Sequence, residues 1–160
     1  MGKTHMKIIV ASDSHYERAM LISLVEEIRR RGDIDTVIHL GDMEGDADWL
    51  RGRLAIPVYS VSGNCDMRYD APPEIVIELG GVRMMLCHGH MQRVKYTLDP
   101  LAYRAMELNV PVALFGHTHA RYLRNEGGVL LLNPGALKDG RYALLEIENG
   151  DIKTPQLLAL

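Results

Sequence analysis

Five short apolar runs, each followed directly by a turn that carries acidic, amide or imidazole side chains, constrain the fold of this chain most. The runs cover residues 7–11, 36–40, 57–61, 82–86 and 111–115. Short apolar runs bounded by turn residues are typical of buried β-strands. If these strands belong to α/β units, their carboxyl ends lie along one edge, where open α/β sheets bind ligands. We therefore expect the turns to form one site.

The segments between the runs predict helices in the first two thirds of the chain. Apolar residues recur at helical spacing across 19–31, and Gly32 is a typical helix end. A short helix is predicted over 45–52. A further helix is predicted over 98–109, because Pro100 suits the first turn of a helix.

Turn signals between paired apolar segments predict three hairpins. The expected strand pairs are 74–79 with 82–86 around Gly80-Gly81, 121–124 with 129–132 around 125–128, and 142–148 with 152–157 around Asn149-Gly150. Asn-Gly is among the strongest hairpin signals. Helices early and hairpins late indicate an α/β (α+β) fold, with two mixed β-sheets packed as a sandwich and helices outside.

Length and composition limit the classes of protein that this chain can belong to. Its 160 residues predict a single domain over 6–160, with residues 1–5 as an N-terminal extension, so His5 is left out of the site. The net charge of −3 gives no basic face for duplex nucleic acid. No apolar stretch is long enough to span a membrane, and the first run is too short for a signal peptide. Two cysteines do not indicate a disulfide scaffold, so a cytoplasmic location is expected.

The side chains in the turns are those that bind metal ions. Taken singly, an aspartate or asparagine after a strand caps a turn, and His39 inside an apolar run is expected to be a core histidine. Two histidines at i and i+2 of one turn have few structural explanations. The joint occurrence of these groups indicates a metal centre; the turns carry Asp13, His15, Asp42, Asn64, His88, His90, His117 and His119.

This order of motifs resembles the calcineurin-like metallophosphoesterase superfamily, and in particular the compact phosphodiesterases of bacteria and archaea. The residues that carry the resemblance are Asp13-Ser14-His15, Gly41-Asp42, Gly63-Asn64-Cys65-Asp66, His88-Gly89-His90, Gly116-His117-Thr118-His119 and the turn Asn133-Pro134-Gly135. The resemblance implies a four-layer αββα sandwich. It also implies a phosphodiesterase that hydrolyses small phosphodiesters by attack of a metal-bridging hydroxide.

The resemblance further implies two divalent metal ions that share one carboxylate. Asp13, His15 and His119 would bind the first ion, Asn64, His88 and His117 the second, and Asp42 both. Oxygen and nitrogen ligands without thiolate suit manganese, our first choice, and also Ni, Fe, Zn or Co. Asp42, Asn64 and His90 are the expected catalytic residues.

The chain departs from the family pattern after Gly63-Asn64. Many relatives have a histidine there that is proposed to protonate the leaving group, whereas this chain has Cys65. A thiol is a poor substitute in that role. His90, solvent or a metal-bound water are the alternatives. Arg68, close by, can be read as a contact to a substrate phosphate or as an exposed loop arginine.

Two questions stay open at the level of sequence. A scaffold protein that keeps the fold without the activity is the alternative function, with the retromer subunit of this fold as the precedent; such a protein need not keep all seven ligands. The apolar tail at 157–160 is expected to pack either in the core or at a homodimer interface.

Overall fold

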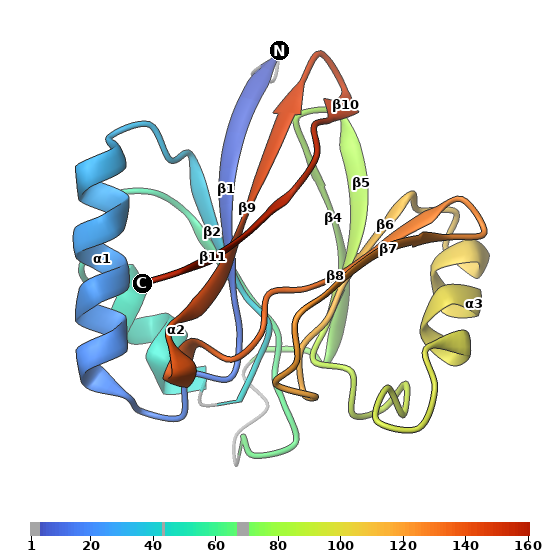
Figure 1. The fold of residues 1–160 in the computed structure, drawn as a ribbon, viewed down its shortest axis with the longest axis horizontal. Coiled ribbons are helices and arrows are strands. Elements are labelled where there is room, and N and C mark those ends of the chain that lie inside the picture. The colour runs from blue at the N-terminus through green and yellow to red at the C-terminus, as the bar shows by residue number, and fades with distance from the viewer. Residues whose placement is uncertain (1–3, 43, 67–70) are drawn as a thin grey trace.

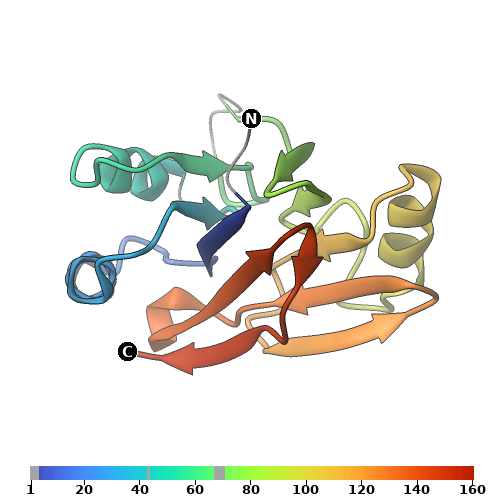
Figure 2. The same cartoon turned by 90° about the horizontal axis from the view of Figure 1, so that it is seen from above.

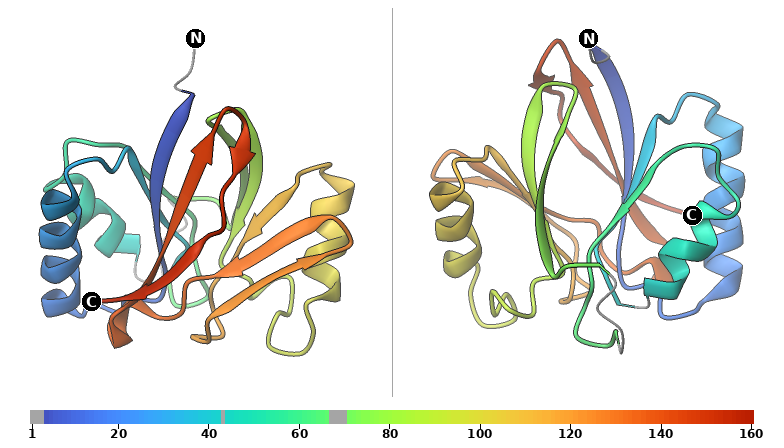
Figure 3. Two further views of the ribbon diagram at one scale, coloured as in Figure 1. Left: turned by 45° about the horizontal axis from the view of Figure 1, so that its top comes forward. Right: turned by 180° about the vertical axis from the view of Figure 1, so that it is seen from behind.

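The computed structural model describes residues 4–42, 44–66 and 71–160 and consists of two β-sheets packed face to face, with helices on the outer faces (Figures 1 and 3). The first sheet has the strand order β10-β9-β1-β2-β3, and β11 also pairs with β9. Its strands are β1 (His5–Ala11), β2 (Thr36–His39), β3 (Val58–Ser60), β9 (Arg141–Glu148), β10 (Asp151–Ile152) and β11 (Gln156–Ala159).

The second sheet has the strand order β4-β5-β6-β8-β7. Its strands are β4 (Glu74–Leu79), β5 (Val82–Cys87), β6 (Val112–Leu114), β7 (Tyr122–Glu126) and β8 (Val129–Asn133). The helices are α1 (Arg18–Arg31), α2 (Glu44–Arg51) and α3 (Asp99–Glu107), with a 3-10 turn at Leu137–Asp139. Figure 2 shows α1 and α2 on one side of the strands and α3 on the other.

Alternation along the strands builds the layers. Ile8 and Val10 of β1 belong to the cluster between the two sheets, while Ile9 and Ala11 belong to the cluster under α1 and α2. Successive side chains of a strand point to opposite faces, so a strand with apolar residues at every position is buried on both sides. A third cluster lies between the second sheet and α3. The predicted αββα arrangement is confirmed.

Parallel pairing brings the carboxyl ends of strands from both sheets to one edge. Strands β1, β2 and β3 are parallel to one another, and so are β5, β6 and β8. The turns that follow β1, β2, β3, β5 and β6 lie at the lower edge in Figure 1. The edge that the sequence predicts is therefore built from two sheets rather than one.

The helices agree closely with the prediction, but two hairpins differ from it. Strand β7 extends to Glu126 and β8 begins at Val129 as predicted, so the predicted four-residue loop is a two-residue glycine turn at 127–128. The predicted strand at 152–157 is wrong, because it is two strands, β10 and β11, which pair with β9 in registers offset by one residue. Residues 153–155 form the interruption. Pro155 lacks the N–H that a continuous ladder needs.

The C-terminal tail packs within the first sheet. Leu157 contacts the cluster between the sheets and Leu158 the cluster under the helices, whereas Leu160 is exposed. Of the two readings of the apolar tail, the structure shows core packing through β11. In the described ranges no helix has the length and apolar character needed to cross a membrane.

Candidate metal centre

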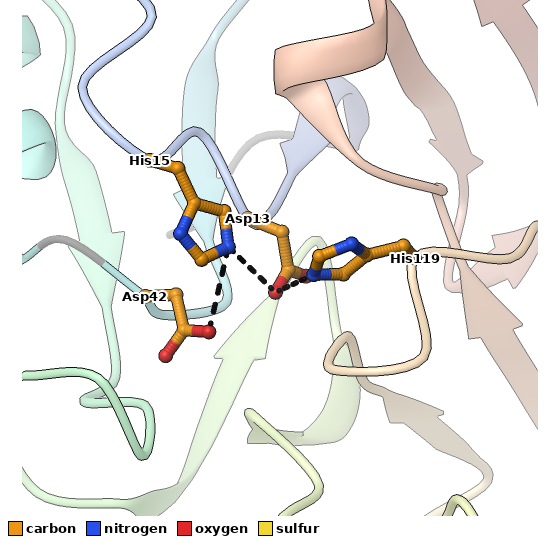
Figure 4. Close-up of side chains that lie close together, drawn as sticks. All are labelled: Asp13, His15, Asp42 and His119. Carbon is orange, nitrogen blue, oxygen red and sulfur yellow. Dashed lines mark ion pairs between the residues drawn. The ribbon is translucent and has the colours of Figure 1, made fainter.

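The first cluster of ligand atoms comes from three turns. Asp13 and His15 follow β1, Asp42 follows β2 and His119 follows β6, and their side chains converge (Figure 4). His119 Nε2 lies 3.2 Å from Asp13 Oδ1. His15 Nε2 lies 3.8 Å from the same oxygen and 3.6 Å from Asp42 Oδ2. The four ligand atoms lie within 4.8 Å of one another, a spacing that can hold one metal ion.

The second cluster lies beside the first and includes Asp42 again. His88 follows β5 and His117 follows β6, and these two form the cluster with Asp42. His88 Nε2 lies 3.3 Å from Asp42 Oδ2 and 3.2 Å from His117 Nδ1. The same carboxylate oxygen, Asp42 Oδ2, therefore faces histidines of both clusters.

The donor set and its unsatisfied atoms fit divalent metal ions. Nitrogen and oxygen atoms that each bind one ion at ~2.1 Å lie roughly 3–3.5 Å from one another, which is close to the distances above. Asp13 Oδ1 and His15 Nε2 are buried and have no hydrogen-bond partner among the described residues. Buried polar atoms are normally paired, so two unpaired atoms aimed at one point indicate a ligand.

Contacts behind the ligands orient them. His88 Nδ1 donates to the Leu40 carbonyl oxygen at 2.8 Å, so in the neutral ring Nε2 carries no proton and is available as a ligand. Asp42 Oδ1 accepts from the Cys65 N–H at 3.0 Å, so Oδ2 is left for the clusters. Asp13 divides its oxygens in the same way, because Oδ2 accepts from the Ser12 hydroxyl and the His117 N–H.

Mutual electrostatics set the charge state of the cluster. Burial raises the pKa of Asp42, but the hydrogen bond and charge of His88 outweigh it, so the pKa of Asp42 is lowered overall. Burial lowers the pKa of His88, and the two aspartates outweigh that effect and raise it. Burial and the neighbouring His88 lower the pKa of His117 to about 4. Asp42 is thus ionised and His117 neutral at neutral pH, the states in which both bind metal.

The remaining predicted site residues lie on the turns after β3 and β5. Asn64 is exposed on the turn after β3, and the N–H of its neighbour Cys65 contacts Asp42. His90 is half-buried, with its ring centroid 5.6 Å from that of His88, and its Nδ1 has no hydrogen-bond partner in the described part of the chain. Burial, then the charge of Asp42, raises the pKa of the Cys65 thiol. Arg68 lies outside the described residues.

Two glycines are required because backbone and ligand approach closely. A Cβ on Gly63 would lie 2.1 Å from Asp42 Oδ1. A Cβ on Gly116 would lie 2.1 Å from Ser12 Oγ and 2.7 Å from Asp13 Oδ2. The small residues of the motifs therefore make room for the carboxylates.

Sequence reasoning named Asn133 and Ser14 within motifs but did not predict that they hold the ligand turns, and it missed Asp46. Asn133 donates to the Gly116 carbonyl and to Thr118 Oγ1 while accepting from the Gly135 N–H, and so fixes the turn that carries His117 and His119. In the sequence, the Asn-Pro-Gly motif marks the position of Asn133. Ser14 and Asp46 are buried and hydrogen-bonded to each other. Asp46 lies inside α2, where no local pattern marks it.

Comparison with known proteins agrees with this geometry. The model of the calcineurin-like phosphoesterase superfamily domain matches residues 6–150. A Bacillus subtilis (strain 168) protein named probable metallophosphoesterase YsnB is 33% identical over 150 residues, which cover 90% of this chain and 86% of that protein.

Solved structures with a similar fold include a predicted phosphoesterase and a Vps29 protein. A conserved Streptococcus pneumoniae TIGR4 protein described as a predicted phosphoesterase is 32% identical with a TM-score of 0.79, covering 99% of this chain and 91% of the other. A single mutant of Vps29 from Entamoeba histolytica is 25% identical with a TM-score of 0.77, covering 97% and 99%. Metallophosphoesterases use divalent metal ions, and the two ligand clusters fit that use. The chain belongs to the calcineurin-like phosphoesterase superfamily.

Proposed function

We propose that this protein is a phosphodiesterase with two metal ions, which hydrolyses small phosphodiesters. The observation that carries the proposal is the position of Asp42 Oδ2, which lies 3.6 Å from His15 Nε2 and 3.3 Å from His88 Nε2. One carboxylate oxygen thus belongs to two clusters whose other members differ. A shared carboxylate is what a pair of closely spaced ions requires.

Asp13, His15 and His119 would hold the first ion, Asn64, His88 and His117 would hold the second, and Asp42 would serve both. Manganese is the proposed metal, because the ligands are oxygen and nitrogen atoms without thiolate. Among the described residues neither ligand cluster includes the Cys65 thiol. When bound, two such ions lower the pKa of a shared water and offset charge on the phosphoryl oxygens.

The protein's own groups prepare the site for this chemistry. Asp13 and Asp42 place two negative charges in a buried position, which favours cations over neutral ligands. Asn64 is exposed, so it is the proposed ligand that an incoming substrate meets first. The Leu40 and Cys65 contacts hold His88 and Asp42 before the metal arrives.

His90 is the proposed proton donor to the leaving group. It lies next to His88 on the turn after β5, and its Nδ1 has no partner among the described residues. Burial, then the charge of His88, lowers the pKa of His90, so only a minor fraction of its rings carries, at neutral pH, the second proton that an imidazolium can donate. Because the donating form is scarce, substrates with good leaving groups should react fastest.

A two-substrate assay tests the proposal. Chelated protein and protein resupplied with manganese are compared on an aryl phosphodiester and the matching monoester. We expect manganese-dependent turnover that is faster on the diester. Replacing His90 with Ala should slow an alkyl ester about 100-fold more than an aryl ester, because only the alkyl leaving group needs a proton. Metal binding without turnover on either ester would refute the enzymatic proposal.

That negative result would favour the second candidate, a scaffold that uses the fold without catalysis. The likeness to Vps29 is the observation behind this alternative. The presence of all seven family ligands, Asn64 included, argues for the enzyme, since a scaffold has no need of them. We propose a cytoplasmic location on the composition alone.

A further inference from the structure

A buried chain of hydrogen bonds runs behind the metal centre, from the turn after β2 to helix α2. The Gly41 N–H donates to His39 Nδ1 at 3.2 Å. His39 Nε2 lies 2.8 Å from Ser14 Oγ, and Ser14 Oγ donates to Asp46 Oδ2 at 2.6 Å. The side chains of His39, Ser14 and Asp46 are fully buried. These three residues stand outside the two ligand clusters.

The donor and acceptor groups determine the direction of each hydrogen bond in this network. A backbone N–H can only donate, so His39 Nδ1 accepts and the neutral ring carries its proton on Nε2. That proton points to Ser14 Oγ, and the single hydroxyl proton of Ser14 then goes to Asp46. Every hydrogen bond runs the same way and ends on the Asp46 carboxylate, which accepts without needing a proton of its own.

Asp46 holds the ligand turn by a second contact as well. The Tyr16 N–H donates to the same oxygen, Asp46 Oδ2, at 2.9 Å. In this turn Asp13, His15 and Tyr16 have positive φ angles of 54°, 47° and 60°. A left-handed conformation is unfavourable for a residue with a side chain, so the turn needs external bonds to keep this shape. The two bonds to Asp46, at Ser14 and at Tyr16, lie on either side of His15.

We propose that Asp46 is a positioning residue that, through Ser14 and the Tyr16 N–H, sets the place of His15 in the first ligand cluster. This inference rests on the proposed metal centre. Because the Gly41 N–H is the other end of the hydrogen-bond network, the network also joins the turn of His15 to the turn of Asp42. Asp46 therefore governs how well His15 Nε2 and Asp42 Oδ2 face one ion, without touching the ion itself.

Manganese titration of substituted full-length protein tests this role. Asp46→Ala removes the acceptor for both bonds. It should weaken manganese binding at the first ligand cluster, the one that contains His15, by about 10–100-fold, the usual effect of losing a group behind a ligand. The site of His88 and His117 should be weakened less, because Asp42 is its one ligand on the two turns that the network joins. Asp46→Asn keeps one oxygen that can accept from Ser14 and Tyr16, so it should restore the affinity to within about threefold of wild type.

Leu50→Ala is the matched control. Leu50 is a fully buried residue of the same helix that packs in the cluster under α1 and α2, and its apolar side chain cannot hydrogen-bond to the ligand turns. It should lower the thermal midpoint of metal-free protein at least as much as Asp46→Ala and leave both manganese affinities unchanged. Equal losses of affinity in the two variants would show that Asp46 acts only through stability, and would overturn the proposal.

The His39 ring gives a second measurement that does not depend on metal. Nitrogen-15 NMR of metal-free wild type and Asp46→Asn should show His39 with its proton on Nε2, and Asp46→Ala should change that signal. Wild type that binds no manganese would refute the proposed function itself. Wild type with two sites that Asp46→Ala leaves intact would refute only the positioning role.

Discussion

Turns at both ends of the sandwich need positive φ angles, but the residues that adopt these angles differ in type. At the end opposite the metal centre, the tight turns are Gly80-Gly81, Gly127-Gly128 and Asn149-Gly150, and the second glycine of each lines a common groove. Their positive φ angles fall on glycine and one asparagine, which adopt them readily. At the metal edge, positive φ angles fall on five of the seven proposed ligands: Asp13, His15, Asp42, His117 and His119.

The contrast shows where the molecule stores strain. Each left-handed residue with a side chain costs ~1–2 kcal/mol that glycine would avoid. Strained residues of this kind gather at functional sites, and the observation supports a need for the side chains themselves. The tight turns of the far end avoid this cost, whereas the metal edge gives up stability to place carboxylates and imidazoles.

The largest expected difference between the ends comes from glycine replacement. In Gly116→Ala the new Cβ would meet Ser12 Oγ and Asp13 Oδ2, so the free energy of unfolding should fall by about 3 kcal/mol. Manganese affinity should fall more than about 100-fold, because Asp13 must move. In Gly128→Ala no atom of the described residues lies within 4 Å of the new Cβ, and only the φ of +82° costs energy, about 1 kcal/mol.

Urea unfolding and manganese titration of both variants provide the comparison. Gly128→Ala should keep wild-type metal affinity. Similar stability losses at the two ends, with metal binding intact in both, would contradict the close approach that defines the metal edge.

A smaller effect should separate glycine from alanine at a strained ligand. His119 has a φ of +62°, so metal-free His119→Gly should be about 1 kcal/mol more stable than His119→Ala. Both variants lose a ligand and should bind manganese weakly. At the far end, Asn149→Gly should change stability by only a few tenths of a kcal/mol, because asparagine tolerates this conformation. Equal thermal midpoints for metal-free His119→Gly and His119→Ala would show that the backbone at position 119 is not strained.

A further effect of similar size is a pH dependence that belongs to the metal edge. Burial, the largest influence, lowers the pKa of His39 below its ordinary value. The unfolded chain therefore binds a proton here that the folded chain excludes, and stability falls as the pH drops below about 6.5. Metal-free wild type should lose stability between about pH 8 and pH 5.5 by at most about 1.4 kcal/mol more than His39→Gln. If the urea midpoints of wild type and His39→Gln shift equally with pH, this would contradict a neutral, buried His39.

Local signals in the sequence predict much of the fold and many site residues, and they fail where the contact is distant in the chain. The run at 7–11 alternates between two apolar layers, so its burial on both faces was predictable. The interruption before Pro155 was not predicted, although the proline itself is the local cause. Ser14 and Asp46 lie 32 positions apart and meet only because α2 packs beside the turn after β1. No spacing rule marks such a pair.

Counting bound metal in Asp42→Asn tests the central claim most directly. Among the described residues Asp42 is the one shared by both clusters, so its carboxylate charge should matter to both ions. Manganese content and diester hydrolysis are measured for wild type, Asp42→Asn and the control Asp48→Asn, whose exposed carboxylate pairs with Arg51 on α2. We predict two ions and turnover in wild type and Asp48→Asn, and loss of both in Asp42→Asn. Two tightly bound ions and full activity in Asp42→Asn would contradict a shared carboxylate.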